Sequence, residues 1–267
     1  MSQGLQFDEE TTRKVEALYL TPDVVAQRYH TLKAVELKEG EHVLDIGSGP
    51  GLLAHDMAVA VGQNGRLCGI DISEDMLAMS RTRCSEQPWT EFRKADATKL
   101  PYPDDSFDAA VSTQVYEYVA DIRTALVELY RVVRPGGRVV ILDTDYGSLV
   151  IYTEDEARMQ RVLAAWDEHF VHGRLPGTLS SQLRDAGFML RHRDVIPMFN
   201  PEYHDNTYAK GALSIIASFV VGRKGVTKSE ADAWLAELAE LGKQGKFFFS
   251  INRYLFLAEK PNLASGR

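Results

Sequence analysis

The chain has 267 residues, of which 45% are hydrophobic and 25% are charged, and its formal net charge at pH 7 is −8. These proportions are ordinary for a globular protein, and a chain of this length can build a large core without disulfide or metal staples. The negative charge argues against a nucleic-acid backbone as the main partner, because such binding needs a basic face.

The cysteines and the chain start give further limits. Cys68 and Cys84 form no disulfide framework, and no Cys/His cluster accompanies them, so no metal site is expected. Residues 1–10 are acidic and lack the apolar segment of a signal peptide. The most apolar run, residues 212–221, is too short to span a bilayer, so no membrane insertion is expected. These features together predict a reduced protein of the cytoplasm.

Predicted strands and helices alternate along the chain, which indicates an α/β fold in a single domain. Strands are expected over residues 43–46, 66–71, 90–94, 107–113, 139–143, 188–197 and 247–258. Helices are expected over residues 8–18, 22–35, 52–62, 122–133, 154–170, 178–186, 209–221 and 229–241, and one more begins after Ser73. A largely helical segment is expected from residue 148 to 171, and a turn over 134–138. This pattern gives N-terminal helices (1–36), a core (37–147), a helical cap with the sixth strand (148–246) and a last strand (247–260).

One stretch dominates the sequence. The apolar strand that ends at Ile46 is followed by three glycines in five positions, Gly47, Gly49 and Gly51, and then by a helix. Glycine tolerates positive φ and has no Cβ, so a ligand can press against this backbone. A strand, a glycine loop and a helix N-terminus together favour a polar cofactor.

The spacing around the loop narrows the choice of cofactor. The dinucleotide pattern G-x-G-x-x-G needs a third glycine where this chain has Leu52, which counts against a nicotinamide or flavin. Asp71 ends the second strand, where an acid can accept both ribose hydroxyls. Asp96 follows the third strand, where it can accept from an adenine amino group.

Taken together, these motifs resemble class I S-adenosylmethionine-dependent methyltransferases, and most closely the branch with the ubiquinone/menaquinone-biosynthesis C-methyltransferases. The resembling segments are residues 43–51, 71, 96–97, 100–108 and 129–137. The resemblance covers about residues 37–143 and implies a Rossmann-like, mostly parallel seven-stranded sheet. It also implies that the last strand enters antiparallel between the fifth and sixth. The implied cofactor is S-adenosyl-L-methionine, with S-adenosyl-L-homocysteine as its product.

The motifs and the resemblance together give a set of cofactor residues. It comprises Arg28, Asp45, Gly47, Ser48, Gly49, Gly51, Asp71, Ile72, Met76, Asp96, Ala97 and Gln114. Three of these have an alternative role. Arg28 either meets the methionine carboxylate or is an exposed helix residue; Met76 packs on the adenine or in the core. Gln114 contacts the cofactor or caps a helix.

Residues for the methyl acceptor are expected at the same end of the sheet and in the cap. The candidates for contact with the acceptor are Tyr19, Tyr116, Glu117, Tyr146 and Tyr208. Packing or turn capping explains each of them equally well. Candidate general bases are Asp145, His172 and His204, each in a predicted loop or at a strand end. A base is needed only for some acceptors, such as a hydroxyl.

The function predicted is methyl transfer to a small, apolar or aromatic metabolite through carbon, oxygen or nitrogen. An NAD(P)-dependent oxidoreductase and a non-catalytic cofactor-binding module are the alternatives. A small-molecule acceptor is the expected partner, and the exposed faces of the cap helices could mediate a homodimer.

Overall fold

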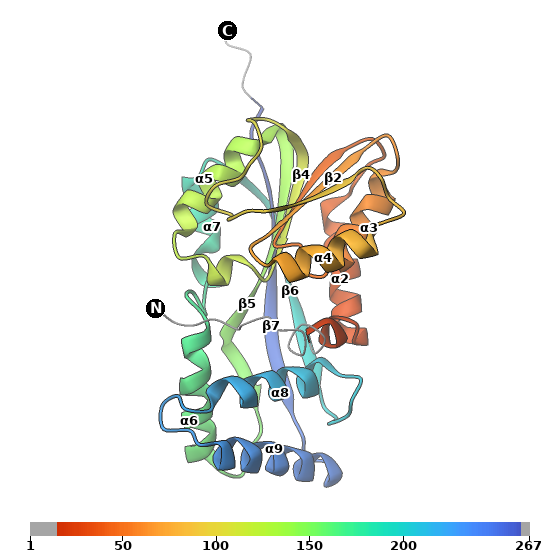
Figure 1. Cartoon of the computed structure of the whole chain (residues 1–267). Helices are drawn as coiled ribbons and strands as arrows, with labels where there is room; N and C mark the ends of the chain where they lie inside the picture. Colours follow the sequence, from red (N-terminus) through yellow and green to blue (C-terminus); the bar gives the residue numbers. More distant parts are fainter. Residues whose placement is uncertain (1–14, 263–267) are drawn as a thin grey trace. The chain divides into compact units, whose positions relative to one another are not determined.

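The computed structural model describes residues 15–262 (Figure 1). The strands are β1 (His42–Ile46), β2 (Arg66–Asp71), β3 (Thr90–Lys94), β4 (Phe107–Thr113), β5 (Val133–Ile151), β6 (Met189–Asn200) and β7 (Phe249–Glu259). The helices are α2 (Pro22–Val35), α3 (Leu52–Val61), α4 (Glu74–Arg83), α5 (Ile122–Val132), α6 (Glu156–Trp166), α7 (Pro176–Asp185), α8 (Tyr208–Val220) and α9 (Lys228–Lys243), with 3₁₀ turns η1 (Tyr116–Tyr118) and η2 (Asp167–His169). Of the helix expected over 8–18, residues 15–18 are helical and 8–14 lie outside the described residues.

The seven strands form one sheet in the order β3-β2-β1-β4-β5-β7-β6. This order confirms the predicted Rossmann-like sheet, with the last strand between the fifth and the sixth. Strand β1 runs parallel to β2 and to β4, with Leu44 opposite Cys68 on one side and Ala110 on the other. Parallel pairing brings the carboxyl ends of these strands to one edge of the sheet, where open α/β sheets bind ligands.

Local capping explains where several elements begin and end. The hydroxyl of Ser73 accepts from the backbone N–H of Met76 at 3.4 Å and so starts α4. Thr227 and Glu230 form a reciprocal capping box at the start of α9. Gly187 follows α7 with φ of 101°, and a Cβ there would lie 2.9 Å from the ring of Tyr130.

The chain divides into two compact units. The first, here called the helical unit, contains the chain up to residue 27, residues 145–173 and residues 197–252. The second, the sheet unit, contains residues 28–144, 174–196 and the chain from 253. Strands β5, β6 and β7 each have residues in both units.

The sheet unit has an apolar cluster on each face of its strands. One cluster includes the helix residues Leu126 and Leu129 of α5 and Leu179 and Leu183 of α7. The other includes residues of α3 and α4, among them Met57, Val61 and Leu77. Both faces of the central strands are therefore covered, which explains why β1 and β4 are apolar without alternation.

The helical unit has a core of its own. Helices α6, α8 and α9 contribute Val162, Leu213 and Trp234, each no more than 1% exposed. Ile151 of β5 and Met198 of β6 belong to the same cluster. This core is aromatic-rich and is built from segments that are far apart in the sequence.

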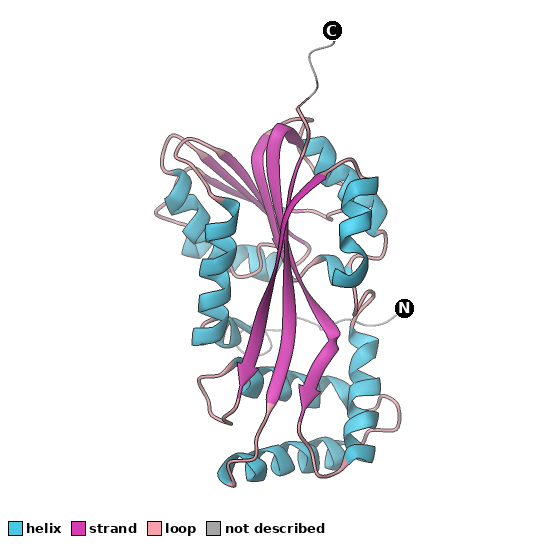
Figure 2. Cartoon of the chain, turned by 180° about the vertical axis from the view of Figure 1, so that it is seen from behind, coloured by secondary structure: helices cyan, strands magenta, loops and turns pink. Residues whose placement is uncertain are grey.

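Strand β5 differs from the prediction at both ends. The strand was expected over 139–143 after a turn, but it runs from Val133 to Ile151 (Figure 2). Phe107 pairs with Val133 and Ala109 pairs with Arg138, so residues 134–137 form a bulge within the strand. The start of the segment expected to be helical from residue 148 was wrong: Ile151 is 7% exposed and the neighbouring Val150 is 54% exposed, the alternation of a strand.

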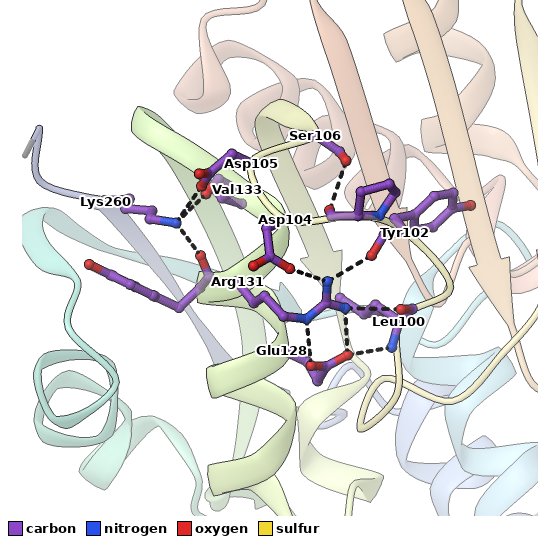
Figure 3. A network of polar contacts seen from close by, with 11 residues as sticks. Leu100, Tyr102, Asp104, Asp105, Ser106, Glu128, Arg131, Val133 and Lys260 are labelled. Carbon is purple, nitrogen blue, oxygen red and sulfur yellow. Dashed lines mark hydrogen bonds and ion pairs between the residues drawn. The ribbon is translucent and has the colours of Figure 1, made fainter.

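A polar network ties the loop after β3 to α5 at the amino end of β4 (Figure 3). Arg131 donates from Nε and Nη2 to the Glu128 carboxylate, at 2.8 Å each. Its guanidinium also donates to the backbone oxygens of Tyr102 and Leu100, at 2.7 and 3.0 Å. The backbone N–H of Leu100 returns a bond to Glu128 at 2.8 Å. Loop residues 100–102 are thus fixed to one side-chain pair.

Between residues 15 and 262, none of the helices combines the length and hydrophobicity needed to cross a bilayer. Within the same described range, no group of three or more His, Cys, Asp and Glu side chains is arranged to hold a metal ion. Cys68 and Cys84 are free, buried thiols.

Candidate functional site

The glycine loop between β1 and α3 has a backbone that other residues rarely adopt. Gly47, Gly49 and Gly51 have φ values of 71°, 53° and 79°. The N–H groups of Gly47 and Ser48 donate to the oxygen of Ile70 on β2, at 2.8 and 2.9 Å. A Cβ on Gly51 would lie 2.7 Å from the Cα of Ser80, whereas a Cβ on Gly49 would meet nothing within 4 Å. The loop is therefore packed against Ser80 of α4 at Gly51, whereas it is open at Gly49.

Asp71, at the end of β2, fastens this loop. Its carboxylate accepts from the N–H of Gly49 and from the N–H of Ser73, at 2.9 Å each. Burial raises the pKa of Asp71, and these N–H bonds oppose the rise. Each carboxylate oxygen has a second lone pair, so Asp71 holds the loop and still has capacity to accept from a ligand.

Asp45, on β1, and Ser48, in the loop, have buried polar atoms without a hydrogen-bond partner in the described chain. Asp45 is 1% exposed and Ser48 is 7% exposed. Neither Oδ2 of Asp45 nor Oγ of Ser48 has a hydrogen-bond partner within the described part of the chain. Burial, with a smaller effect of the Asp71 carboxylate, raises the pKa of Asp45 to about 7. A buried polar atom without a partner is costly, so these two atoms mark a place that favours a polar ligand.

The predicted adenine side is formed where β2 and β3 end. Ile72 is 68% exposed, which leaves a bare apolar side chain beside Asp71. Met76 is 4% exposed and Ala97 is 6% exposed, so both are core residues in this structure. Asp96 is exposed, and its carboxylate accepts from the N–H and hydroxyl of Thr98, at 2.8 and 2.6 Å.

The end of β4 turns sharply at Gln114, which has φ of 58°. Its N–H donates to the oxygen of Leu142 at 2.7 Å, and its side-chain amide donates to the hydroxyl of Thr144. Tyr116 follows and is fully buried, and its hydroxyl has no partner among the described residues. Glu117 is also fully buried and accepts from the N–H of Thr144 at 3.1 Å.

Arg28 of α2 is half-buried and donates from Nε to the carboxylate of Asp56 on α3, at 3.0 Å. This ion pair lies within the sheet unit. Helix α3 begins at Gly51 without a side-chain cap in the described chain. Arg28 is thus fixed to the helix whose N-terminus closes the glycine loop.

The predicted acceptor tyrosines other than Tyr116 belong to the helical unit. Tyr146 stacks on Phe170 with ring centroids 3.6 Å apart, and Trp166 lies edge-on to Tyr146 at 6.4 Å. Tyr19 packs against the same apolar cluster. Tyr208 is 7% exposed and lies 5.9 Å from the ring of Phe249.

The three candidate bases also lie in the helical unit. Asp145 accepts from the N–H of Gly147 at 3.0 Å, and Nδ1 of His204 accepts from the N–H of Asn206 at 3.1 Å. These two side chains stabilise local turns. Nε2 of His172 is buried and has no hydrogen-bond partner among residues 15–262.

Sequence reasoning missed two buried titratable residues. Asp143 is fully buried in the middle of β5 and accepts from the N–H of Val115 at 3.1 Å. The signal was available, because Asp143 directly follows an apolar run, as Asp71 does. His169 stacks on Trp166 at 4.4 Å, and burial with the nearby charge of Arg223 lowers its pKa to about 4. No sequence motif marks His169.

Comparison with known proteins finds matches over parts of the chain. Residues 44–141 match a family model described as a methyltransferase domain. An uncharacterized 37.1 kDa transposon protein of Streptomyces fradiae is 32% identical over 231 residues, 85% of this chain and 65% of that protein. The demethylmenaquinone methyltransferase of Oceanobacillus iheyensis is 33% identical over 129 residues, 48% of this chain and 54% of that protein. The chain therefore spans only about half to two thirds of these relatives.

Solved structures agree on the fold. Phosphoethanolamine N-methyltransferase 2 of Haemonchus contortus, in complex with S-adenosyl-L-methionine, has a TM-score of 0.64 at 21% identity. That match covers 96% of this chain and 58% of the other. The [4+2]-cyclase SpnF has a TM-score of 0.59 at 20% identity, with 90% and 82% covered. A fold shared with a cyclase shows that the fold alone does not set the reaction.

Residues 44–141 thus match a class of proteins described as methyltransferase domains, and the sheet order agrees with that match. Within that class, about half of the chain is similar to demethylmenaquinone methyltransferases. The residues present fit the cofactor of this class, S-adenosylmethionine. A Cβ on Gly49 would meet nothing within 4 Å, and the neighbouring residues Asp45 and Ser48 carry buried oxygens without a partner in the described chain.

Proposed function

We propose that the protein transfers a methyl group from S-adenosylmethionine to a small, apolar or aromatic metabolite. The observation that carries this proposal is the buried, unsatisfied Oδ2 of Asp45, two residues before a glycine loop that is open at Gly49. Such an arrangement is unfavourable in the free protein and is relieved by a ligand that supplies hydrogen-bond donors. S-adenosylmethionine supplies both an ammonium group and ribose hydroxyls.

The cofactor residues act as binding and orienting groups. Asp71 accepts from the ribose hydroxyls while it keeps the N–H groups of Gly49 and Ser73 in place. Ile72 offers its exposed apolar side chain to one face of the adenine, and Asp96 accepts from the adenine amino group. Gly47 and Gly51 shape the loop, and Met76 and Ala97 support it from the core.

Charge complements the choice of cofactor. When bound, S-adenosylmethionine supplies a methyl group activated by a positively charged sulfur. Asp45 and Asp71 lie close enough for their carboxyls to affect each other, so a cationic ligand favours the ionised form of both. Arg28, Gln114 and the N-terminus of α3 are the groups proposed to meet the methionine end.

The acceptor class rests on the helical unit and on the relatives. The stacked rings of Tyr146 and Phe170, with Trp166 against them, favour a flat or apolar acceptor. Tyr19, Tyr116, Glu117 and Tyr208 remain proposed contacts. Several relatives are named demethylmenaquinone methyltransferases, which supports a quinone-like acceptor, although they match only about half of this chain.

A general base is optional in this proposal, because holding two reactants in line can lower a barrier by roughly 7–11 kcal/mol. Where the acceptor is a hydroxyl, His172 is favoured over Asp145 and His204. Its Nε2 is not engaged in a turn, whereas the side chains of the other two are.

The test is methyl transfer from isotopically labelled S-adenosylmethionine to fractions of a metabolite extract, read by mass spectrometry. A product heavier by one labelled methyl group supports the proposal, and quinone or phenol fractions are expected to give it. Binding of S-adenosylhomocysteine without any labelled product would indicate a non-catalytic module instead. Binding of NAD(P)H but not of S-adenosylhomocysteine would contradict the proposal.

A further inference from the structure

Two fully buried acids, Asp143 and Glu117, lie near each other beside the carboxyl end of β4. Asp143, in the middle of β5, accepts from the N–H of Val115 at 3.1 Å. Glu117, in η1, accepts in return from the N–H of Thr144 at 3.1 Å. Each acid thus holds the backbone of the other's segment.

The segment held by these acids is strained. Gln114 has φ of 58°, a value that a side chain with a Cβ rarely adopts. Two further bonds fix it, from its N–H to the oxygen of Leu142 and from its amide to the hydroxyl of Thr144. A residue held in a left-handed conformation by its surroundings is often part of a functional site.

The strained turn touches the glycine loop. A Cβ placed on Gly47 would lie only 2.2 Å from a methyl carbon of Val115. The side chain of Val115 therefore packs directly on the backbone of Gly47. A line of contacts runs from Asp143, through the N–H of Val115 and its side chain, to the first glycine of the loop.

We infer that Asp143 and Glu117 are positioning residues for cofactor binding: by holding the turn at residues 114–117, they set the place of Val115 against Gly47. The inference rests on the proposed function, since the ligand is S-adenosylmethionine. Burial and the Glu117 carboxyl raise the pKa of Asp143 well above its usual range, so a neutral amide is a fair replacement at that position. Oδ2 of Asp143, which has no partner in the described chain, tolerates that replacement.

The test compares three substitutions by calorimetry with S-adenosylhomocysteine, at a temperature where circular dichroism shows each variant folded. Asp143→Ala removes the acceptor for the N–H of Val115 and should weaken binding about tenfold, which corresponds to the loss of one buried hydrogen bond. Asp143→Asn keeps an acceptor oxygen and should restore affinity to within about threefold. Asp108→Ala is the matched control, because Asp108 is a buried acid at the other end of β4 that accepts from the N–H of His42 at 2.8 Å.

Asp108→Ala should lower the melting temperature as Asp143→Ala does, but leave the affinity unchanged. If Asp143→Ala does not fold, Val115→Ala tests the same line of contacts, because it leaves the backbone bonds intact, and affinity should fall about threefold for the lost packing. If Asp143→Ala, or Val115→Ala in its place, binds S-adenosylhomocysteine as tightly as the wild type, the inference is wrong and the proposed function is unaffected. Absence of binding by the wild type would overturn the proposed function and the inference with it.

Discussion

The two ends of the sheet unit use acidic residues in opposite ways. At the amino end of β4, Glu128 and Arg131 satisfy each other and the backbone of the loop (Figure 3). The Arg131 bonds lower the pKa of Glu128. At the carboxyl end, Asp45 and Asp143 are buried with unsatisfied oxygens, and their pKa values are raised. Paired acids stabilise the fold, whereas unsatisfied acids mark the place where a ligand completes the structure.

The largest expected effect is at the carboxyl end. Asp71→Ala removes the acceptor for the N–H of Gly49 and the proposed acceptor for the ribose, and should weaken binding of S-adenosylhomocysteine by about 1.5–3 kcal/mol. This corresponds to roughly 10- to 150-fold in affinity, measured by calorimetry. Asp75→Ala, on the exposed first turn of α4, is the control and should bind normally. Unchanged affinity of Asp71→Ala would mean that this carboxylate does not meet the ribose.

The amino end should respond in stability and not in binding. Arg131→Ala leaves the Glu128 carboxylate and two carbonyl oxygens without their donor, and should lower the free energy of unfolding by about 2 kcal/mol. Urea denaturation measures this loss. Arg134→Ala, whose side chain is 56% exposed, should cost less than about 1 kcal/mol. A large loss of cofactor affinity in folded Arg131→Ala would show that the two ends are not separate.

The pH dependence of Asp45 gives a third comparison. Its pKa rises from 3.8 to about 7 on folding, so the folded state holds a proton that the unfolded state has released. The contribution of Asp45 to the stability of the free protein is therefore fully present below pH 3.8, and it is lost as the pH rises to about 7.

Asp45→Asn should remove that dependence. At pH 8 the free variant should melt higher than the wild type, by about 2–4 °C for each kcal/mol gained, while its affinity for S-adenosylmethionine falls. Scanning calorimetry from pH 4 to pH 8 measures the difference. A wild type whose stability does not change with pH relative to the variant would contradict the buried, protonated acid.

The smallest effect on stability is expected for Lys260, whose side chain binds residues at the amino end of β4. Its ammonium donates to Asp105 at 2.7 Å and to the backbone oxygens of Tyr130 and Val133 at 2.9 and 2.8 Å. Lys260→Met should cost about 1 kcal/mol of unfolding free energy and leave binding unchanged. Lys243→Met is the control, because Lys243 is 75% exposed in its ion pair with Glu240 and should have no measurable effect.

The same contrast explains what the sequence could predict. The glycine loop and Asp71 are visible because their chemistry is local: an apolar strand, glycines, and a carboxylate directly after a strand. The length of β5 could not be predicted, because Pro135-Gly136-Gly137 indicates a turn. In the structure these residues form a bulge in a strand that pairs with β4 on both sides of it.

The hydrogen-bond partners of Arg131 and of Asp143 could not be predicted from the sequence either. Arg131 binds backbone oxygens of a loop 29 residues away or more, and no side-chain pattern encodes a carbonyl as partner. Asp143, like Asp71, is a carboxylate that follows an apolar run. Its role depends on the left-handed conformation of Gln114, which the sequence does not predict because the residue is not a glycine.

The central claim is that the open loop and the unsatisfied acids of the sheet unit receive the adenosyl group. A crystal structure of the protein with S-adenosylhomocysteine tests it most directly. The expected result is a ribose hydroxyl within hydrogen-bond distance of Asp71 and ligand or ordered water on Oδ2 of Asp45. A ligand bound elsewhere, with Asp71 contacting only Gly49 and Ser73, would contradict the claim.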